Sequence, residues 1–105
     1  MVLKMTSIRQ FQKMMKDIYF HHDSKRGAKA TYEWLKSEVT ELGEALEKRD
    51  VKGLKEEFAD VFAWLCSLAN LLDIDLETTC YERYPNRCPK CGNNPCTCPF
   101  RKAPL

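Results

Sequence analysis

The 105-residue chain has no apolar run near the roughly 18–20 uninterrupted residues that a membrane-spanning helix needs. The opening stretch MVLKMTSIRQFQKMM has no continuous apolar core and no small-residue cleavage site, so we expect no secretory signal. The chain also shows neither a strand pattern nor an internal repeat. These absences favour an all-α protein in the reducing cytoplasm, without a membrane partner. In that compartment, cysteines are more often ligands or free thiols than disulfides.

Charge is unevenly spread along the chain, although the net charge is only +2. Residues 1–32 sum to +5, residues 33–77 to −7 and residues 78–105 to +4. A negative middle between positive ends suits a site that gathers metal cations and has basic groups nearby for an anionic ligand. Most of these charges are still expected to solvate helix faces.

Apolar residues recur at helical spacing in three long segments and one short one. The predicted helices run from about Thr6 to His22, from an N-cap at Thr31 to Arg49, from Leu54 to Leu72, and from a cap at Asp75 to Tyr84 before Pro85. The turn RDVKG is short enough to make the second and third helices antiparallel neighbours. The second helix carries the apolar stripe Tyr32, Leu35, Val39, Leu42 and Leu46, and the third carries Leu54, Phe58, Val61, Leu65, Leu68 and Leu72.

About eighty residues in thin helices supply only a small core for one chain. We therefore expect a helical bundle that is completed by oligomerisation, as a homodimer or homotetramer. The change in composition at Pro85 suggests an all-α domain over residues 1–84 and a Cys-rich tail over residues 85–105.

Four carboxylates lie beside the apolar stripes of the second and third helices. Glu38 and Glu41 are three residues apart and share one face, as do Glu57 and Asp60. An antiparallel pairing would bring the four together at the edge of the core, where uncompensated carboxylates are costly. A hard divalent cation with oxygen ligands relieves this cost, and Mg²⁺ is the typical choice. Taken alone, either pair is more often solvated surface, and we assign Glu44, Glu47 and Glu56 to the surface.

The segments SEVTELGEAL, LKEEFADVFAWLCSLANLLDIDLE and RYPNRCPKCG together resemble the MazG-like nucleotide pyrophosphohydrolases. That all-α family is marked by E-x-x-E followed, after a spacer, by E-x-x-D. Here Glu38–Glu41 and Glu57–Asp60 match the two elements. The resemblance covers about residues 6–84 and is strong over 34–77. Family members often carry an acid where this chain has Ser37, so an auxiliary carboxylate is not expected at that position.

The resemblance implies a hydrolase that cleaves a nucleoside triphosphate between the α and β phosphates, releasing a monophosphate and pyrophosphate. Clearing non-canonical nucleotides is one role it suggests. It implies that Glu38, Glu41, Glu57 and Asp60 hold Mg²⁺ (or Mn²⁺) and form the catalytic set, with a slight preference for Glu41 as the base. Phosphates also need basic partners. The candidates for substrate binding are Lys25, Arg26 and Lys29 in the expected first loop, Lys55, and Trp34 as a base-stacking residue.

The tail contains CPKCGNNPCTC, which places Cys88, Cys91, Cys96 and Cys98 within eleven residues. The first pair has the spacing of a metal-binding knuckle, whereas the second pair is closer than usual. The pattern favours a structural zinc site that orders a tail too short to fold alone. An iron–sulfur centre and two disulfides stay open as alternatives. Cys66 and Cys80 lie in helical segments and are expected to be buried or free thiols.

Two other interpretations were weighed. A di-iron carboxylate bundle needs Glu-x-x-His on two helices, and Ile18 and Tyr19 stand where the glutamates would be. We reject it. A non-enzymatic helical dimer whose basic zinc knuckle binds nucleic acid is the alternative function, supported only by the run YERYPNRCPK. In the enzyme interpretation, nucleic acid is not an expected partner. Base and sugar preference cannot be inferred from these residues.

Overall fold

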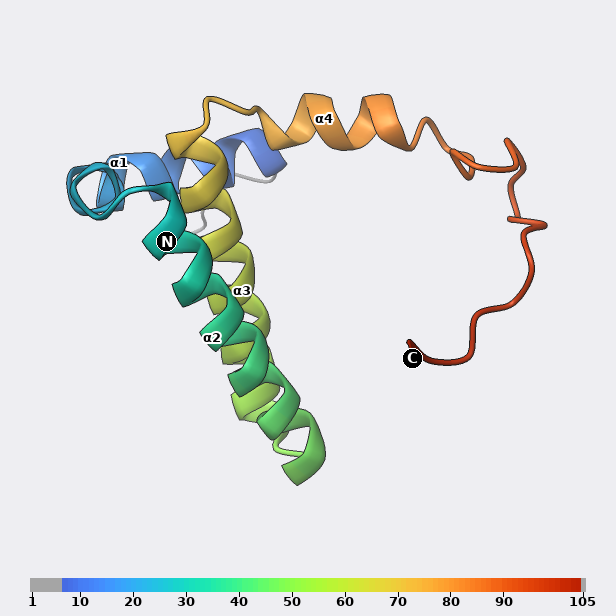
Figure 1. Ribbon diagram of the computed structural model, residues 1–105, viewed down its shortest axis with the longest axis horizontal. Helices are drawn as coiled ribbons and strands as arrows, with labels where there is room; N and C mark the ends of the chain where they lie inside the picture. Colours follow the sequence, from blue (N-terminus) through green and yellow to red (C-terminus); the bar gives the residue numbers. More distant parts are fainter. Residues whose placement is uncertain (1–6, 105) are drawn as a thin grey trace, which may run out of the picture.

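The computed structural model describes residues 7–104, and within that range it contains helices and no strand. The helices are α1 (Ile8–Arg26), α2 (Ala28–Lys48), α3 (Val51–Leu71) and α4 (Leu76–Arg83). Figure 1 shows α2 and α3 side by side as a long hairpin, with α1 across one end and α4 leading away into an irregular tail. The predicted all-α fold is confirmed. None of the helices is long and apolar enough to cross a membrane, within the described part of the chain.

Helix α1 begins and ends later than predicted. Ser7 is its N-cap, and a capping box links the Ser7 side chain with the N–H of Gln10 and the Gln10 side chain with the N–H of Ser7. The predicted start, Thr6, lies outside the described residues. The helix continues past His22 to Arg26 and stops at Gly27, whose φ of 88° favours glycine. Gly27 alone connects α1 to α2, where a longer first loop was expected.

The start of α2 is a correction to the predicted N-cap at Thr31. Gly27 precedes the helix, and Thr31 lies inside it with no exposed surface. The Thr31 hydroxyl instead accepts a hydrogen bond from Arg26 Nη1 at 3.2 Å. Because one residue joins α1 to α2, the chain turns sharply there, as Figure 1 shows. Lys25, Arg26 and Lys29 therefore lie on helix ends rather than in a loop.

The α2–α3 hairpin closes through two residues, fewer than predicted. Arg49 adopts a left-handed conformation with φ 53°, and Asp50 caps α3 by accepting from the N–H of Gly53 at 3.1 Å. The helix therefore begins at Val51 rather than Leu54. A Cβ on Gly53 would lie 2.5 Å from Asp50 Oδ2, so a larger residue there would have to displace the capping side chain. The short turn holds the two helices in a fixed register.

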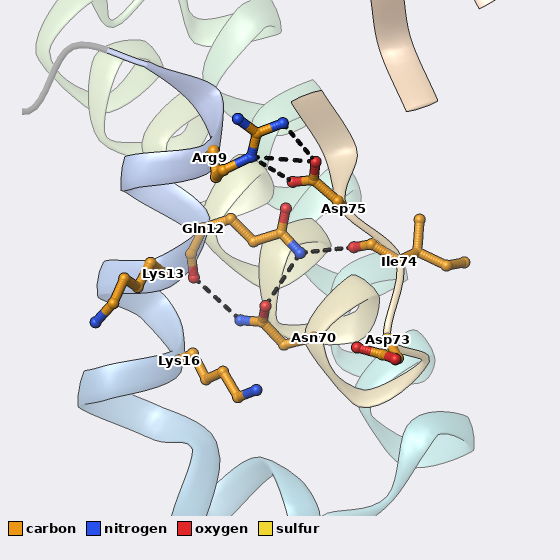
Figure 2. Close-up of a pocket in the computed structure, with 8 residues that line it drawn as sticks. All are labelled: Arg9, Gln12, Lys13, Lys16, Asn70, Asp73, Ile74 and Asp75. Carbon is orange, nitrogen blue, oxygen red and sulfur yellow. Dashed lines mark hydrogen bonds and ion pairs between the residues drawn. The ribbon is translucent and has the colours of Figure 1, made fainter. Parts of the chain in front are cut away.

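A buried polar network joins α1 to the start of α4 (Figure 2). Gln12 Nε2 donates to Asn70 Oδ1 at 3.0 Å and to the Ile74 carbonyl at 2.7 Å, and Gln12 Oε1 accepts from the N–H of Leu76. On the surface, Arg9 pairs with Asp75 at 2.8 Å, and hydrogen bonds from Arg9 and Thr78 lower the pKa of Asp75 to about 2. Gln12 and Asp75 thus have their hydrogen-bond and ion-pair partners within the chain. We therefore assign a structural role to the pocket that they line, which holds α1 against the start of α4.

Few side chains of the described residues are fully buried. The buried apolar residues are Met15, Ala45, Cys66 and Ala69. Parts of both predicted apolar stripes face outward instead, together with Val51 from the predicted turn, at a spacing of seven residues. We call these two sets the exposed rows: Tyr32, Val39 and Leu46 on α2, and Val51, Phe58, Leu65 and Leu72 on α3. Phe58 keeps 63% of its surface exposed and Leu46 keeps 65%, so the single chain leaves much of its apolar surface uncovered.

Candidate metal centre

Three of the predicted acidic side chains meet between the two arms of the hairpin. Glu38 and Glu41 come from consecutive turns of α2, and Glu57 comes from α3. Each offers one carboxylate oxygen, and these oxygens all lie within 4.8 Å of one another. We call this set the acidic cluster. Spacing by three residues places the first two on one face, and the short turn brings the third opposite them.

Asp60 lies beside the acidic cluster, one turn along α3 from Glu57. Its carboxyl is within hydrogen-bonding reach of Glu57, and its charge acts on Glu38 as well. It falls outside the group whose oxygens are mutually within 4.8 Å. Asp60 also lines a neighbouring cavity and therefore stands between the cluster and that cavity.

The electrostatics of the cluster are unfavourable without a counter-charge. Glu38 Oε2 and Glu57 Oε1 are buried and have no hydrogen-bond partner within residues 7–104. A hydrogen bond with Glu41, burial and the surrounding negative charges raise the pKa of Glu38 to about 7. Burial, followed by the charges of Glu41 and Asp60, raises the pKa of Glu57. Each of these causes disfavours the ionised form, as expected where like charges share a poorly solvated site.

The donor set fits a hard divalent cation. It consists of carboxylate oxygens alone, and two of them are buried without partners. Buried polar atoms without partners are rare and call for an explanation such as a bound ion. Oxygen-only sites of this kind suit Mg²⁺ or Mn²⁺. Metal binding would satisfy both oxygens and offset the repulsion.

A cavity of about 250 Å³ adjoins Asp60, between the end of α1 and the middle of α3. Arg26 lies over the Trp64 ring, with its guanidinium carbon 4.9 Å from the ring centroid. Trp64 also stacks on Trp34, with centroids 5.8 Å apart and ring planes at 14°. Residues lining the cavity include Tyr19, His22, Asp23, Arg26, Asp60 and Trp64.

The structure separates the predicted substrate-binding residues into two groups. Arg26 lines the cavity. Trp34 does not line it but stacks on Trp64, which does. Lys25, Lys29 and Lys55 are exposed, and none of these three lines the cavity. The sequence analysis missed Asp23, because its segment was taken for a break between helices. Trp64 was missed as well, because its place in the cavity depends on the packing of α1 against α3.

The four tail cysteines also converge. The Sγ atoms of Cys88 and Cys98 are 3.8 Å apart, as are those of Cys91 and Cys96, and all four lie within 4.8 Å of one another. These distances are far longer than the 2.05 Å of a disulfide, and the four are free thiols here. A tetrahedron with metal–sulfur bonds of about 2.3 Å has edges of about 3.8 Å.

The tail backbone turns around these sulfur atoms. The N–H of Gly92 donates to the Cys88 carbonyl at 2.8 Å, and the N–H of Cys88 donates to the Asn93 carbonyl at 2.9 Å. The N–H of Thr97 donates to Cys91 Sγ at 3.4 Å. Such backbone hydrogen bonds lower the pKa of Cys91 to about 5, whereas contacts with Cys96 and Cys88 raise the pKa of Cys98 to about 12. Cys66 is buried in α3, and Cys80 is exposed on α4, both outside the cluster.

Metal-free protein should lose stability as the pH rises, because the folded-state pKa of Glu38, about 7, exceeds the ordinary value of 4.5. The protonated form is favoured in the fold, so its contribution is fully present below about pH 4.5 and is lost as the pH passes 7. Between acidic and alkaline pH, the free energy of unfolding should change by about 1 kcal/mol less in Glu38→Gln than in wild type, after allowance for solvent screening. Thermal unfolding with chelator at acidic and alkaline pH measures it, with Glu44→Gln as control. An equal pH dependence in wild type and E38Q would contradict the raised pKa.

Comparison with known proteins places the chain in a family. No curated protein matches it. The family model of the MazG nucleotide pyrophosphohydrolase domain matches residues 26–92, well over half of the chain. The match includes the acidic cluster, Asp60 and the first two cysteines of the tail. With four helices, no strand in the described residues and carboxylates gathered between two of the helices, the chain belongs to the MazG nucleotide pyrophosphohydrolase domain family.

Proposed function

We propose that the protein is a Mg²⁺-dependent nucleoside triphosphate pyrophosphohydrolase. It cleaves between the α and β phosphates and yields a nucleoside monophosphate and pyrophosphate. The observation that carries this proposal is the acidic cluster, in which two buried carboxylate oxygens lack partners. Family membership supports a nucleotide pyrophosphohydrolase in general. Clearance of non-canonical nucleotides is the role we propose for this activity.

Glu38, Glu41, Glu57 and Asp60 would hold the metal, with Mn²⁺ as an alternative to Mg²⁺. The bound ion would supply charge neutralisation at the phosphate oxygens and a more acidic water. The water oxygen bonds to the α phosphorus. The bond from this phosphorus to the oxygen that bridges the α and β phosphates breaks, and pyrophosphate leaves. A carboxylate at the edge of the cluster takes the proton of the water. Glu41 is our candidate for this base, because it is the exposed member of the acidic cluster.

Basic residues balance the phosphate charge in this proposal. Arg26 lies nearest, since it lines the cavity beside Asp60, and it acts through its charge because its Nη1 is already bonded to Asp23. Lys25 and Lys29 lie near it in the sequence, on the facing ends of α1 and α2, and Lys55 lies on α3. We assign these three to longer-range attraction of the anionic substrate, which acts without direct contact. Trp34 is the proposed aromatic platform, and its ring keeps 52% of its surface exposed.

We further propose that Cys88, Cys91, Cys96 and Cys98 hold a structural Zn²⁺. Sulfur–sulfur distances of 3.8 Å match the edge of a tetrahedral zinc–thiolate site. Four thiolates leave no open position for water, so this ion has no catalytic part. Its contribution is to order the tail, because residues 84–104 contain no helix or strand and present few buried side chains.

The exposed rows support a homo-oligomer, as a dimer or a tetramer. Heptad spacing places Tyr32, Val39 and Leu46 on one line along α2, and the row on α3 follows the same spacing. Exposed apolar area of this extent is characteristic of protein interfaces. A second copy of the chain is the partner whose helices carry the same repeat.

Pyrophosphate release from a panel of canonical and damaged nucleoside triphosphates tests the activity. We expect turnover with Mg²⁺ or Mn²⁺ and none with chelator. Glu38→Gln, Glu57→Gln and Asp60→Asn should each lower kcat/KM by about 100-fold or more, because each removes a charged metal ligand. Glu44→Gln and Glu56→Gln are matched controls on exposed positions of the same helices. If folded, metal-loaded protein hydrolyses none of the panel, the result would contradict the hydrolase and favour the nucleic-acid-binding alternative.

Metal analysis of protein purified under reducing conditions tests the tail. We expect one zinc per chain in addition to the metal at the acidic cluster. Cys91→Ser should release the zinc and increase amide exchange over residues 85–104, because a thiolate ligand is lost. Cys80→Ser is the control, since this exposed cysteine lies outside the cluster. Iron at this site, or disulfides between these cysteines in the purified protein, would contradict the proposal.

Sedimentation equilibrium tests the assembly. The mass should be two or four times the 12.3 kDa of one chain. Phe58→Glu places a charge in the exposed row of α3 and should shift the equilibrium toward monomer, because burying an unpaired charge is costly. Lys52→Glu introduces the same side chain outside that row and should leave the mass unchanged. A wild-type monomer at micromolar concentration would refute the oligomer.

A further inference from the structure

Asp23, which lines the cavity beside Asp60, carries a buried acceptor oxygen with no hydrogen-bond partner among the described residues. Asp23 keeps only 2% of its surface exposed, and its Oδ1 accepts from Arg26 Nη1 at 2.8 Å. Its Oδ2 is buried and has no hydrogen-bond partner. Asp23 lines the cavity. Leaving a buried carboxylate oxygen unpaired is costly, so this oxygen is suited to a donor that arrives with a ligand.

Arg26 is not free to supply that donor. Its Nη1 is shared between Asp23 Oδ1 and Thr31 Oγ1, and its guanidinium lies over the Trp64 ring. These contacts hold the Asp23 carboxylate in one orientation. A fixed acceptor beside a pocket is the kind of group that gives a binding site its specificity.

The position of the cavity indicates which part of a substrate it takes. It adjoins Asp60, whose neighbours form the acidic cluster, so a ligand with phosphates at the cluster extends toward it. Its volume of about 250 Å³ is below the roughly 300–1,000 Å³ of pockets that take a whole drug-sized ligand. It is also flanked by the aromatic ring of Trp64. A nucleobase, rather than a whole nucleotide, suits this space.

We propose that Asp23 is a specificity-determining residue, whose Oδ2 accepts a hydrogen bond from the exocyclic amino group of the substrate base. Carboxylates pair with such amino groups in base recognition, as with the N4 amine of cytosine. The enzyme then favours triphosphates of amino-bearing bases over those with a carbonyl at the same position. A carbonyl there would set two acceptors against each other and leave Oδ2 unpaired. This inference rests on the proposed function.

Two matched substrate pairs test the proposal: dCTP against dUTP, and ATP against ITP. Each pair differs by an amino group in place of a carbonyl. Wild-type kcat/KM should favour the amino member by about tenfold or more in at least one pair, as expected for a hydrogen bond to a charged group. No preference for the amino member in either pair would overturn the proposal without any variant.

Asp23→Asn is the informative variant. The amide keeps a carbonyl oxygen for Arg26 and places an NH₂ donor where Oδ2 was. The preference should fall to parity or reverse, whereas a purely structural role for Asp23 would lower both members of a pair equally. Asp17→Asn makes the same chemical change at an exposed position on α1 and should leave the ratio unchanged. An unaltered ratio in D23N would overturn the proposal and leave the proposed hydrolase intact.

Binding of the product-like monophosphates dCMP and dUMP tests the role of Asp23 separately from the proposed hydrolase activity. Calorimetric titration with Mg²⁺ present needs no hydrolysis. If no triphosphate is hydrolysed, the proposed function fails, yet tighter binding of dCMP by wild type and its loss in D23N would still support the role of Asp23. Equal affinity of the wild type for dCMP and dUMP, together with equal affinity for AMP and IMP, would overturn that role.

Discussion

The repulsion between carboxylates on neighbouring helices is the constraint on which this structure depends. Glu38, Glu41 and Glu57 place oxygens within 4.8 Å of one another, and two of these residues have buried oxygens without partners. Carboxylates that repel one another would normally move apart into water. The hairpin keeps them together, because the Asp50 cap and the close approach of Gly53 set the register of α3 against α2. The fold therefore holds a group of mutually repelling carboxylates, and the proposed cation would offset that repulsion.

Holding that arrangement requires rigid helices, and the single chain provides rigidity mainly at one end of the hairpin. There, α1 packs on α3 and is fastened by the Gln12 network. Figure 1 shows the other end extending beyond α1 and α4. The most exposed members of the exposed rows, Leu46, Val51 and Phe58, lie in the half of the hairpin nearest the α2–α3 turn. A second copy along these rows would support the arms between which the acidic cluster lies, which links assembly to metal binding.

Features of the fold and site that depend on residues close together in the sequence could be predicted, whereas features that depend on distant residues could not. Spacing by three residues and a short turn were enough to bring Glu38, Glu41 and Glu57 together, because both are local properties. The tail cysteines converge for the same reason. Helix ends were less accurate, since Asp50 and Gly27 begin helices where other residues were expected. Asp23 could not be found, because its role arises from packing of α1 on α3, residues some forty positions apart, which periodicity does not encode.

The two clusters of potential ligands differ in chemistry and in place, and this difference bears on their roles. Oxygen donors between α2 and α3 select hard cations, whereas the sulfur donors of the tail select softer ones such as zinc. Exchange of metals between the two sites is therefore disfavoured. Figure 1 shows the tail beyond α4, well apart from the hairpin of the same chain. In the proposed oligomer, the tail of one copy would therefore be the one able to approach the acidic cluster of another copy.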